Sequence, residues 1–263
     1  MMQRTLLALS LSLALATGAT AQQPEDSAAS ALPGDADPQK VADTSAFDDR
    51  DPWESFNRSI FTFNEVVDRN LLKPVARGYN RVTPEPVNDG VSNFFSNLSE
   101  PGNILNSLLQ GKGEDALIST GRFIFNTTFG LLGLVDVASY MELPEKEEDF
   151  GQTFGYWGAD SGPFLMLPFL GPSTVRDATG RGVDYAIPDL MDEVDSPEVY
   201  YLYALYGVDL RASLLSYEEQ ITGDRYTFIR NAYLQRREYQ VNDGRVENDP
   251  FANDDEDMML EDF

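Results

Sequence analysis

The chain has 263 residues and a formal net charge of -25, with 19 Lys and Arg against 44 Asp and Glu. Nucleic acid is excluded as a partner, because affinity for phosphate backbones comes from clustered Lys and Arg that displace counterions. The absence of His and Cys excludes Ser-His-Asp and Cys-His nucleophile systems, imidazole-bound metals and disulfides. We therefore expect a non-enzyme without cofactor or metal.

The first 21 residues are predicted to be a secretory signal peptide. Arg4 supplies a basic start, the run from Leu6 to Ala16 is mostly apolar, and Ala19-Thr20-Ala21 offers small residues for cleavage. The apolar run falls short of the roughly 20 residues of a membrane-spanning helix, so we expect export and a mature chain that begins at Gln22. Residues 22–49 contain almost no large apolar side chains and predict a flexible acidic leader.

Residues 50–241 are predicted to form one helical domain, because apolar residues recur at steps of three and four. The first helix should begin at Asp51-Pro52-Trp53-Glu54, with Asp51 as N-cap and Glu54 completing a capping box. It should end no later than Lys73-Pro74. Further helices are predicted over residues 87–98, 101–109 and 114–128.

The segment 151–182 is dense in Gly, Pro and aromatic residues and shows neither helical nor strand periodicity. We predict irregular apolar structure there. Ser196-Pro197-Glu198 should then begin a helix that continues to Gly223, and Asp224 a last helix with Tyr226, Ile229 and Tyr233 on one stripe. Residues 242–263 predict a disordered acidic tail. Strand patterns are sparse, so the predicted fold class is all-α.

The longest strongly apolar stretch runs from Phe123 to Val135. As a helix it would cover about 20 Å, against about 30 Å of hydrocarbon in a bilayer. It therefore does not span a membrane, and both a buried core helix and insertion into one leaflet are open. The same two alternatives, core packing or a membrane interface, apply to the tyrosine cluster Tyr200, Tyr201, Tyr203 and Tyr206.

Charged groups offer two further kinds of site. Some arginines could bind phospholipid phosphates, although salt bridges are the simpler interpretation for most of them: Arg176, Arg181, Arg230, Arg236 and Arg237. An acidic run could bind a cation, but it lacks the ligand spacing and turn glycine of an EF-hand, which favours a solvated loop: Glu145, Glu147, Glu148 and Asp149.

Several blocks between about Asp51 and Tyr239 resemble the MlaA/VacJ family. They include Asp51-Pro52-Trp53-Glu54-Ser55-Phe56-Asn57-Arg58, Asn93-Phe94-Phe95-Ser96-Asn97-Leu98, Asp149-Phe150-Gly151-Gln152-Thr153-Phe154-Gly155, Leu167-Pro168-Phe169-Leu170-Gly171-Pro172-Ser173-Thr174 and Tyr233-Leu234-Gln235-Arg236-Arg237. The resemblance implies a ring of amphipathic helices in the inner leaflet of the outer membrane. It also implies removal of mislocalised phospholipids from the outer leaflet. Their acceptor would be a periplasmic lipid-carrier protein of the MlaC type, with trimeric porins as membrane partners.

On this interpretation, the candidates for membrane insertion or the lipid pathway are Phe123, Phe125, Phe129, Leu131, Leu132, Phe164, Met166 and Phe169. The candidate headgroup contacts are Arg122 and Arg176. Family members commonly carry a lipobox cysteine, which this chain lacks, so we expect attachment to the periplasmic face of the outer membrane without an acyl anchor. Two alternatives are a porin-associated structural protein without its own lipid channel and a periplasmic carbohydrate-acting enzyme with two catalytic carboxylates.

Overall fold

The computed structural model describes residues 47, 49–188, 190–218, 221 and 223–245. The predicted signal peptide, nearly all of the leader and most of the acidic tail lie outside these residues. The described chain is mainly helical, which confirms the all-α class. Its α-helices and strands are α1 (Glu54–Val67), α2 (Lys73–Val82), α3 (Glu85–Leu109), α4 (Gly113–Thr128), α5 (Phe150–Tyr156), β1 (Phe164–Leu167), β2 (Gly171–Thr174), α6 (Val175–Asp184), α7 (Glu198–Ser213) and α8 (Arg225–Val241).

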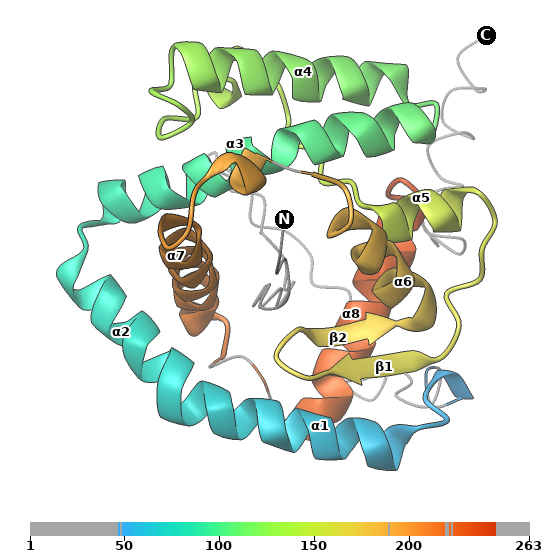
Figure 1. Cartoon of the computed structure of the whole chain (residues 1–263). Helices are drawn as coiled ribbons and strands as arrows, with labels where there is room; N and C mark the ends of the chain where they lie inside the picture. The colour runs from blue at the N-terminus through green and yellow to red at the C-terminus, as the bar shows by residue number, and fades with distance from the viewer. Residues whose placement is uncertain (1–46, 48, 189, 219–220, 222, 246–263) are drawn as a thin grey trace, which may run out of the picture.

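The helices follow one another around a ring (Figure 1). In that view α1, α2 and α3 form an arc, α4 lies along the outside of α3, and α7 packs inside the arc against α2 and α3. The β-hairpin contacts α1 through β1 and α8 through β2, while α5 packs against α6 and α8. The hairpin and these last helices complete the ring that the family resemblance implied.

The helical path does not stop at Lys73-Pro74, although α1 itself ends earlier, at Val67. It continues through a π turn, η2 (Asp68–Leu72), directly into α2, and the Lys73 N–H donates to the Asp68 carbonyl five residues earlier. The wider turn accommodates Pro74, which has no N–H and whose ring crowds the preceding turn. Pro101 likewise lies inside α3, so the two helices predicted on either side of it are one. Packing of α3 against α4, α5 and α7 offsets the hydrogen bond that proline removes.

Asp51 does not cap α1, contrary to the capping-box prediction. The helix begins at Glu54 with Trp53 in the cap position. Asp51 is instead buried, where its carboxylate accepts hydrogen bonds from Asn57 and from the Tyr226 hydroxyl of α8. The carboxylate therefore ties the start of α1 to the last helix, a long-range role that the local pattern could not indicate.

The segment predicted to be irregular contains α5, an antiparallel hairpin and α6. In the hairpin, Phe164 pairs with Thr174 and Leu167 with Gly171. The outer edge of β1 is held by asparagine side chains of α1. Asn57 donates to the Phe164 carbonyl at 3.1 Å, and Asn64, two turns later, donates to the Leu167 carbonyl at 2.9 Å. Because side chains satisfy this edge in place of a third strand, the hairpin leaves no pattern of repeated strands in the sequence.

The buried apolar core lies between the hairpin and α8. It consists of Phe164, Met166, Tyr226, Tyr233 and Leu234. The predicted α8 stripe is confirmed, since Tyr226, Ile229 and Tyr233 are all buried. Phe164 stands edge-on to the rings of Tyr226 and Tyr233, at centroid distances of 6.2 and 6.3 Å.

Helices α5 and α6 cross at two glycines. A Cβ on Gly180 would lie 2.3 Å from the backbone nitrogen of Gly151, and a Cβ on Gly151 would lie 2.6 Å from Nη2 of Arg237. Neither position has room for a side chain, so the glycines allow the two helix backbones to approach closely and place α5 beside the arginine of α8.

The substitution Gly180→Ala is expected to lower the free energy of unfolding by about 3 kcal/mol, because the added methyl group must push the two backbones apart. The matched control is Gly182→Ala on the same helix, where nothing lies within 4 Å of the new Cβ. It should raise the stability by about 0.5–1 kcal/mol through its better helix propensity. Urea denaturation of both variants measures the difference, and equal effects would contradict the close crossing.

Candidate functional site

An apolar loop follows α4 and projects its side chains outward. It comprises residues 129–135, and Phe129, Leu131 and Leu132 are 67%, 69% and 67% exposed. Leu134 and Val135 are also exposed. A run of exposed apolar side chains of this kind marks a surface that meets a partner or a membrane.

A buried arginine on α4 holds the base of this loop. The Arg122 side chain is 2% exposed, and its Nε donates to Glu100 of α3 at 2.8 Å. Its Nη1 donates to the Leu143 carbonyl at 2.7 Å, and its Nη2 to Asp136 at 3.1 Å. One guanidinium therefore joins α3, α4 and both ends of the segment that follows the loop.

Asn126 and Asp136 complete the base. Asn126 donates to Asp136 at 2.9 Å and accepts from the Ala138 N–H at 2.8 Å. Burial opposes ionisation of Asp136, but hydrogen bonds from Ser139 and Asn126 and the charge of Arg122 outweigh it and lower the pKa of the Asp136 carboxyl. The polar groups of this segment are thus bound inward, which leaves the apolar side chains on the outside.

The two leucines of the loop adopt an unfavourable backbone conformation. Leu131 has a φ of 55° and Leu132 a φ of 61°, in the left-handed region that costs a residue with a Cβ about 1–2 kcal/mol. Both side chains are also exposed. Strain combined with an exposed apolar side chain indicates a functional role for this loop.

The other lipid-pathway candidates lie in three different environments. Phe123 and Phe125 are half-buried on α4. Phe164 and Met166 are 0% and 1% exposed and belong to the core, so their side chains do not reach the outer surface, and their role in membrane insertion or a lipid pathway stays a prediction. They point inward because β1 is covered by α1 and α8. Phe169, in the hairpin turn, is partly exposed and contacts Phe63 edge-on at 5.1 Å.

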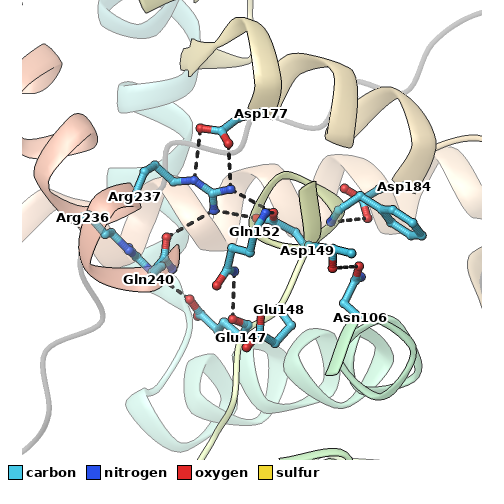
Figure 2. Close-up of polar contacts among 12 residues, drawn as sticks. Asn106, Glu147, Glu148, Asp149, Gln152, Asp177, Asp184, Arg236, Arg237 and Gln240 are labelled. Carbon is cyan, nitrogen blue, oxygen red and sulfur yellow. Dashed lines mark hydrogen bonds and ion pairs between the residues drawn. The ribbon is translucent and has the colours of Figure 1, made fainter. Parts of the chain in front are cut away.

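The two candidate headgroup contacts, Arg122 and Arg176, both have side chains enclosed in ion pairs, and their contact with a headgroup stays a prediction. Arg176 bonds to Asp177 at 3.0 Å. Figure 2 shows the neighbouring network, in which Arg237 of α8 binds Asp177 of α6 and Asp149 at the start of α5. In so acidic a protein these guanidinium groups find carboxylates within the fold.

The acidic run 145–149 is similarly occupied. Glu147 pairs with Arg236 at 2.7 Å and Glu148 with Lys112 at 2.8 Å. Figure 2 shows Glu147 and Glu148 beside this network. These carboxylates join the segment before α5 to Lys112 in the turn between α3 and α4 and to Arg236 of α8, so the interpretation as a freely solvated loop is incomplete.

Residues beyond the predicted stretch add to the exposed apolar surface. Tyr140 is 85% exposed and Met141 is also exposed, both on the short 3-10 helix η3 (Ser139–Met141). The predicted apolar stretch ends at Val135, before Asp136, although the apolar residues after Asp136 were a usable signal. None of the described helices combines the length and apolar character needed to cross a bilayer.

Two carboxyl groups of the Figure 2 network have pKa values that are shifted in opposite directions. Burial opposes ionisation of Asp177, but the charges of Arg237 and Arg176 outweigh it and lower its pKa to about 2. Burial and the nearby charge of Asp149 raise the pKa of Asp184 to about 7. Asp184 accepts from the Phe150 N–H at 3.4 Å.

Stability should therefore fall as the pH rises from about 4 to 7, because the unfolded chain then releases the Asp184 proton that the folded chain retains. Asp184→Asn should remove this loss and exceed the wild type at pH 8 by on the order of 1 kcal/mol. Urea denaturation at pH 5 and pH 8 measures it, with Asp160→Asn at an exposed position as control. If the difference in free energy of unfolding between Asp184→Asn and the wild type is the same at pH 5 and pH 8, the raised pKa of Asp184 is contradicted.

Asparagine tolerates the left-handed backbone better than leucine does. The double variant Leu131→Asn, Leu132→Asn is thus expected to raise the free energy of unfolding by about 1 kcal/mol per site in the absence of lipid. Leu117→Asn, an exposed position inside α4, serves as control and should not stabilise. A destabilised double variant would show that the leucine side chains support the fold.

Comparison with known proteins places the chain in a family. The family model described as MlaA lipoprotein matches residues 49–240. The intermembrane phospholipid transport system lipoprotein MlaA of Haemophilus influenzae is 37% identical over 203 residues, which cover 74% of this chain and 81% of that protein. The Escherichia coli protein of the same name is 35% identical, with coverages of 74% and 80%.

A solved structure agrees with these relatives. It comes from work on the structural basis for maintenance of bacterial outer membrane lipid asymmetry, and its TM-score to this chain is 0.65 at 36% sequence identity. The match covers 73% of this chain and 98% of that chain. Sequence and fold therefore lead to one conclusion: the chain belongs to the MlaA lipoprotein family.

Proposed function

We propose that this protein transports phospholipid between membranes and maintains outer-membrane lipid asymmetry. Membership of the family, whose named relatives belong to an intermembrane phospholipid transport system, supports the transport function. The observation that carries the proposal in this structure is the apolar loop, which is strained, exposed and held from beneath by the buried Arg122. Such a loop provides a contact with lipid.

The loop supports attachment by apolar burial. Inserting a few hundred Å² of its side chains into hydrocarbon would contribute several kcal/mol at about 25 cal/mol per Å². The net charge of -25 gives no attraction to an anionic lipid surface. We therefore propose that the exported protein lies at the periplasmic face of the outer membrane, in the inner leaflet, and is held there without an acyl anchor.

The proposed route takes mislocalised phospholipids from the outer leaflet and transfers them to a periplasmic carrier of the MlaC type. A trimeric porin is the proposed membrane partner. Both partners rest on the family resemblance. The transfer needs no covalent chemistry, which fits a chain without the His or Cys of common catalytic sites.

The double variant Leu131→Asn, Leu132→Asn with Phe129→Ser should move the protein from the membrane fraction toward the soluble periplasmic fraction. The reason is loss of apolar burial, so a high-salt wash of the wild type should release little. Tyr239→Ser on α8 is the control, since it removes another exposed ring, beside a polar cleft. Release by salt alone, or a folded triple variant that stays bound, would contradict this mode of attachment.

Transport itself is tested in cells. Deletion of the gene should leave excess phospholipid in the outer leaflet and increase detergent sensitivity, and the wild-type gene should reverse both. Unchanged outer-leaflet phospholipid in the deletion strain would refute the proposal. Mass spectrometry of lipid that copurifies with the protein separates it from the porin-associated structural alternative, which predicts no bound lipid.

A further inference from the structure

An apolar pocket lies on another part of the ring, between α1, η2, the hairpin and α8. It encloses about 640 Å³, counting the open space at its mouth. Its apolar lining includes Phe61, Val67, Leu72, Met166, Phe169 and Ile229. Its mainly apolar lining is typical of sites that hold an apolar ligand or part of one.

One wall of the pocket is charged. Arg211 of α7 lines it with its side chain 2% exposed, and bonds to Asp68 through Nε at 2.6 Å and through Nη2 at 2.9 Å. Nη2 also reaches Glu218 at 2.5 Å. Arg225, at the start of α8, lines the same pocket and bonds to Glu218 at 2.8 Å.

Two donors of these arginines are left over. Nη1 of Arg211 and Nε of Arg225 are buried and have no hydrogen-bond partner among the described residues. A buried donor without an acceptor is unfavourable, and more so when the group is charged. Their presence beside an apolar pocket indicates a ligand that brings an oxygen acceptor into an otherwise apolar site.

The charges of the wall decide what kind of acceptor fits. Among the described residues, the cations Lys73, Arg211 and Arg225 are matched by the anions Glu65, Asp68 and Glu218. A phosphate or carboxylate would add an unmatched negative charge next to Asp68, which is costly in a buried place. An uncharged carbonyl oxygen accepts the hydrogen bond without that penalty.

We propose that this pocket is a glycerolipid subsite, in which the apolar walls hold the start of an acyl chain and Arg211 Nη1 donates to its ester carbonyl. The subsite rests on the proposed lipid transport and adds to it a basis for selecting lipids by their linkage. The protein would recognise the ester linkage, which phospholipids with different headgroups share.

The test compares two lipids that differ only in the carbonyl. Purified full-length protein is incubated with vesicles of equal parts diester phosphatidylcholine and its dialkyl ether analogue, re-isolated, and its bound lipids are quantified by mass spectrometry. The wild type should retain the diester in roughly tenfold or greater excess, the effect of one hydrogen bond to a charged donor. A ratio near one would overturn the subsite while leaving lipid transport intact. Absence of both lipids would instead count against the proposed function as well.

Two variants assign the preference to the pocket. Arg211→Lys retains the charge facing Asp68 but removes Nη1, so the diester preference should fall to near one while lipid remains bound. Val67→Phe fills the apolar part without touching the ion pairs, and should reduce both lipids together. Thermal melts establish that each variant is folded. A folded Arg211→Lys variant that keeps the preference, or a folded Val67→Phe variant with unchanged bound lipid, would overturn the proposal.

Discussion

Buried arginine–carboxylate pairs between different elements are the constraint on which the ring depends. Arg122 joins α4 to α3 through Glu100, Arg211 joins α7 to η2 through Asp68, and Arg237 joins α8 to α5 and α6. Removing one partner of a buried pair leaves an uncompensated charge, which is strongly unfavourable. Each pair therefore determines how its helices are placed, and the elements around the ring are linked by contacts that tolerate little displacement.

This framework explains why so much apolar surface can remain outside. The main buried apolar cluster lies between the hairpin and α8, whereas large apolar side chains on α1, α4 and the apolar loop are exposed. In a protein surrounded by water, those side chains would be expected inside and the arginines outside. The inverted arrangement suits an environment of lipid, in which charges must be satisfied within the protein and apolar groups can face outward.

The apolar loop and the pocket share one feature, which is that charged groups are paired within the protein while apolar groups stay available for contact. At the loop, Arg122 and Asp136 bind the backbone inward and leave leucine side chains outside. At the pocket, Arg211 and Arg225 are balanced by carboxylates, yet each keeps one donor unused beside an apolar lining. On our proposals, the loop presents apolar groups to a membrane and the pocket presents a donor to a single lipid, and both depend on arginines that ion pairs hold in position.

The sequence by itself determined the helical class, the apolar stretch after residue 122, the buried stripe of α8 and the family, since these follow from local periodicity and from blocks of neighbouring residues. Only the tertiary structure decided the rest. Lys73-Pro74 and Pro101 predicted helix ends, but a π turn and packing against neighbouring helices carried the helices through them. Asp51 satisfied every local condition for a cap and became a buried partner of α8.

Phe164 and Met166 differed from Phe129 and Leu132 in no local property, and whether each faced the core or the outside depended on which distant element covered it. Partners separated by more than a hundred residues, such as Asn57 with Phe164 or Arg211 with Asp68, leave no periodic trace in the chain because their contact forms only when the ring closes.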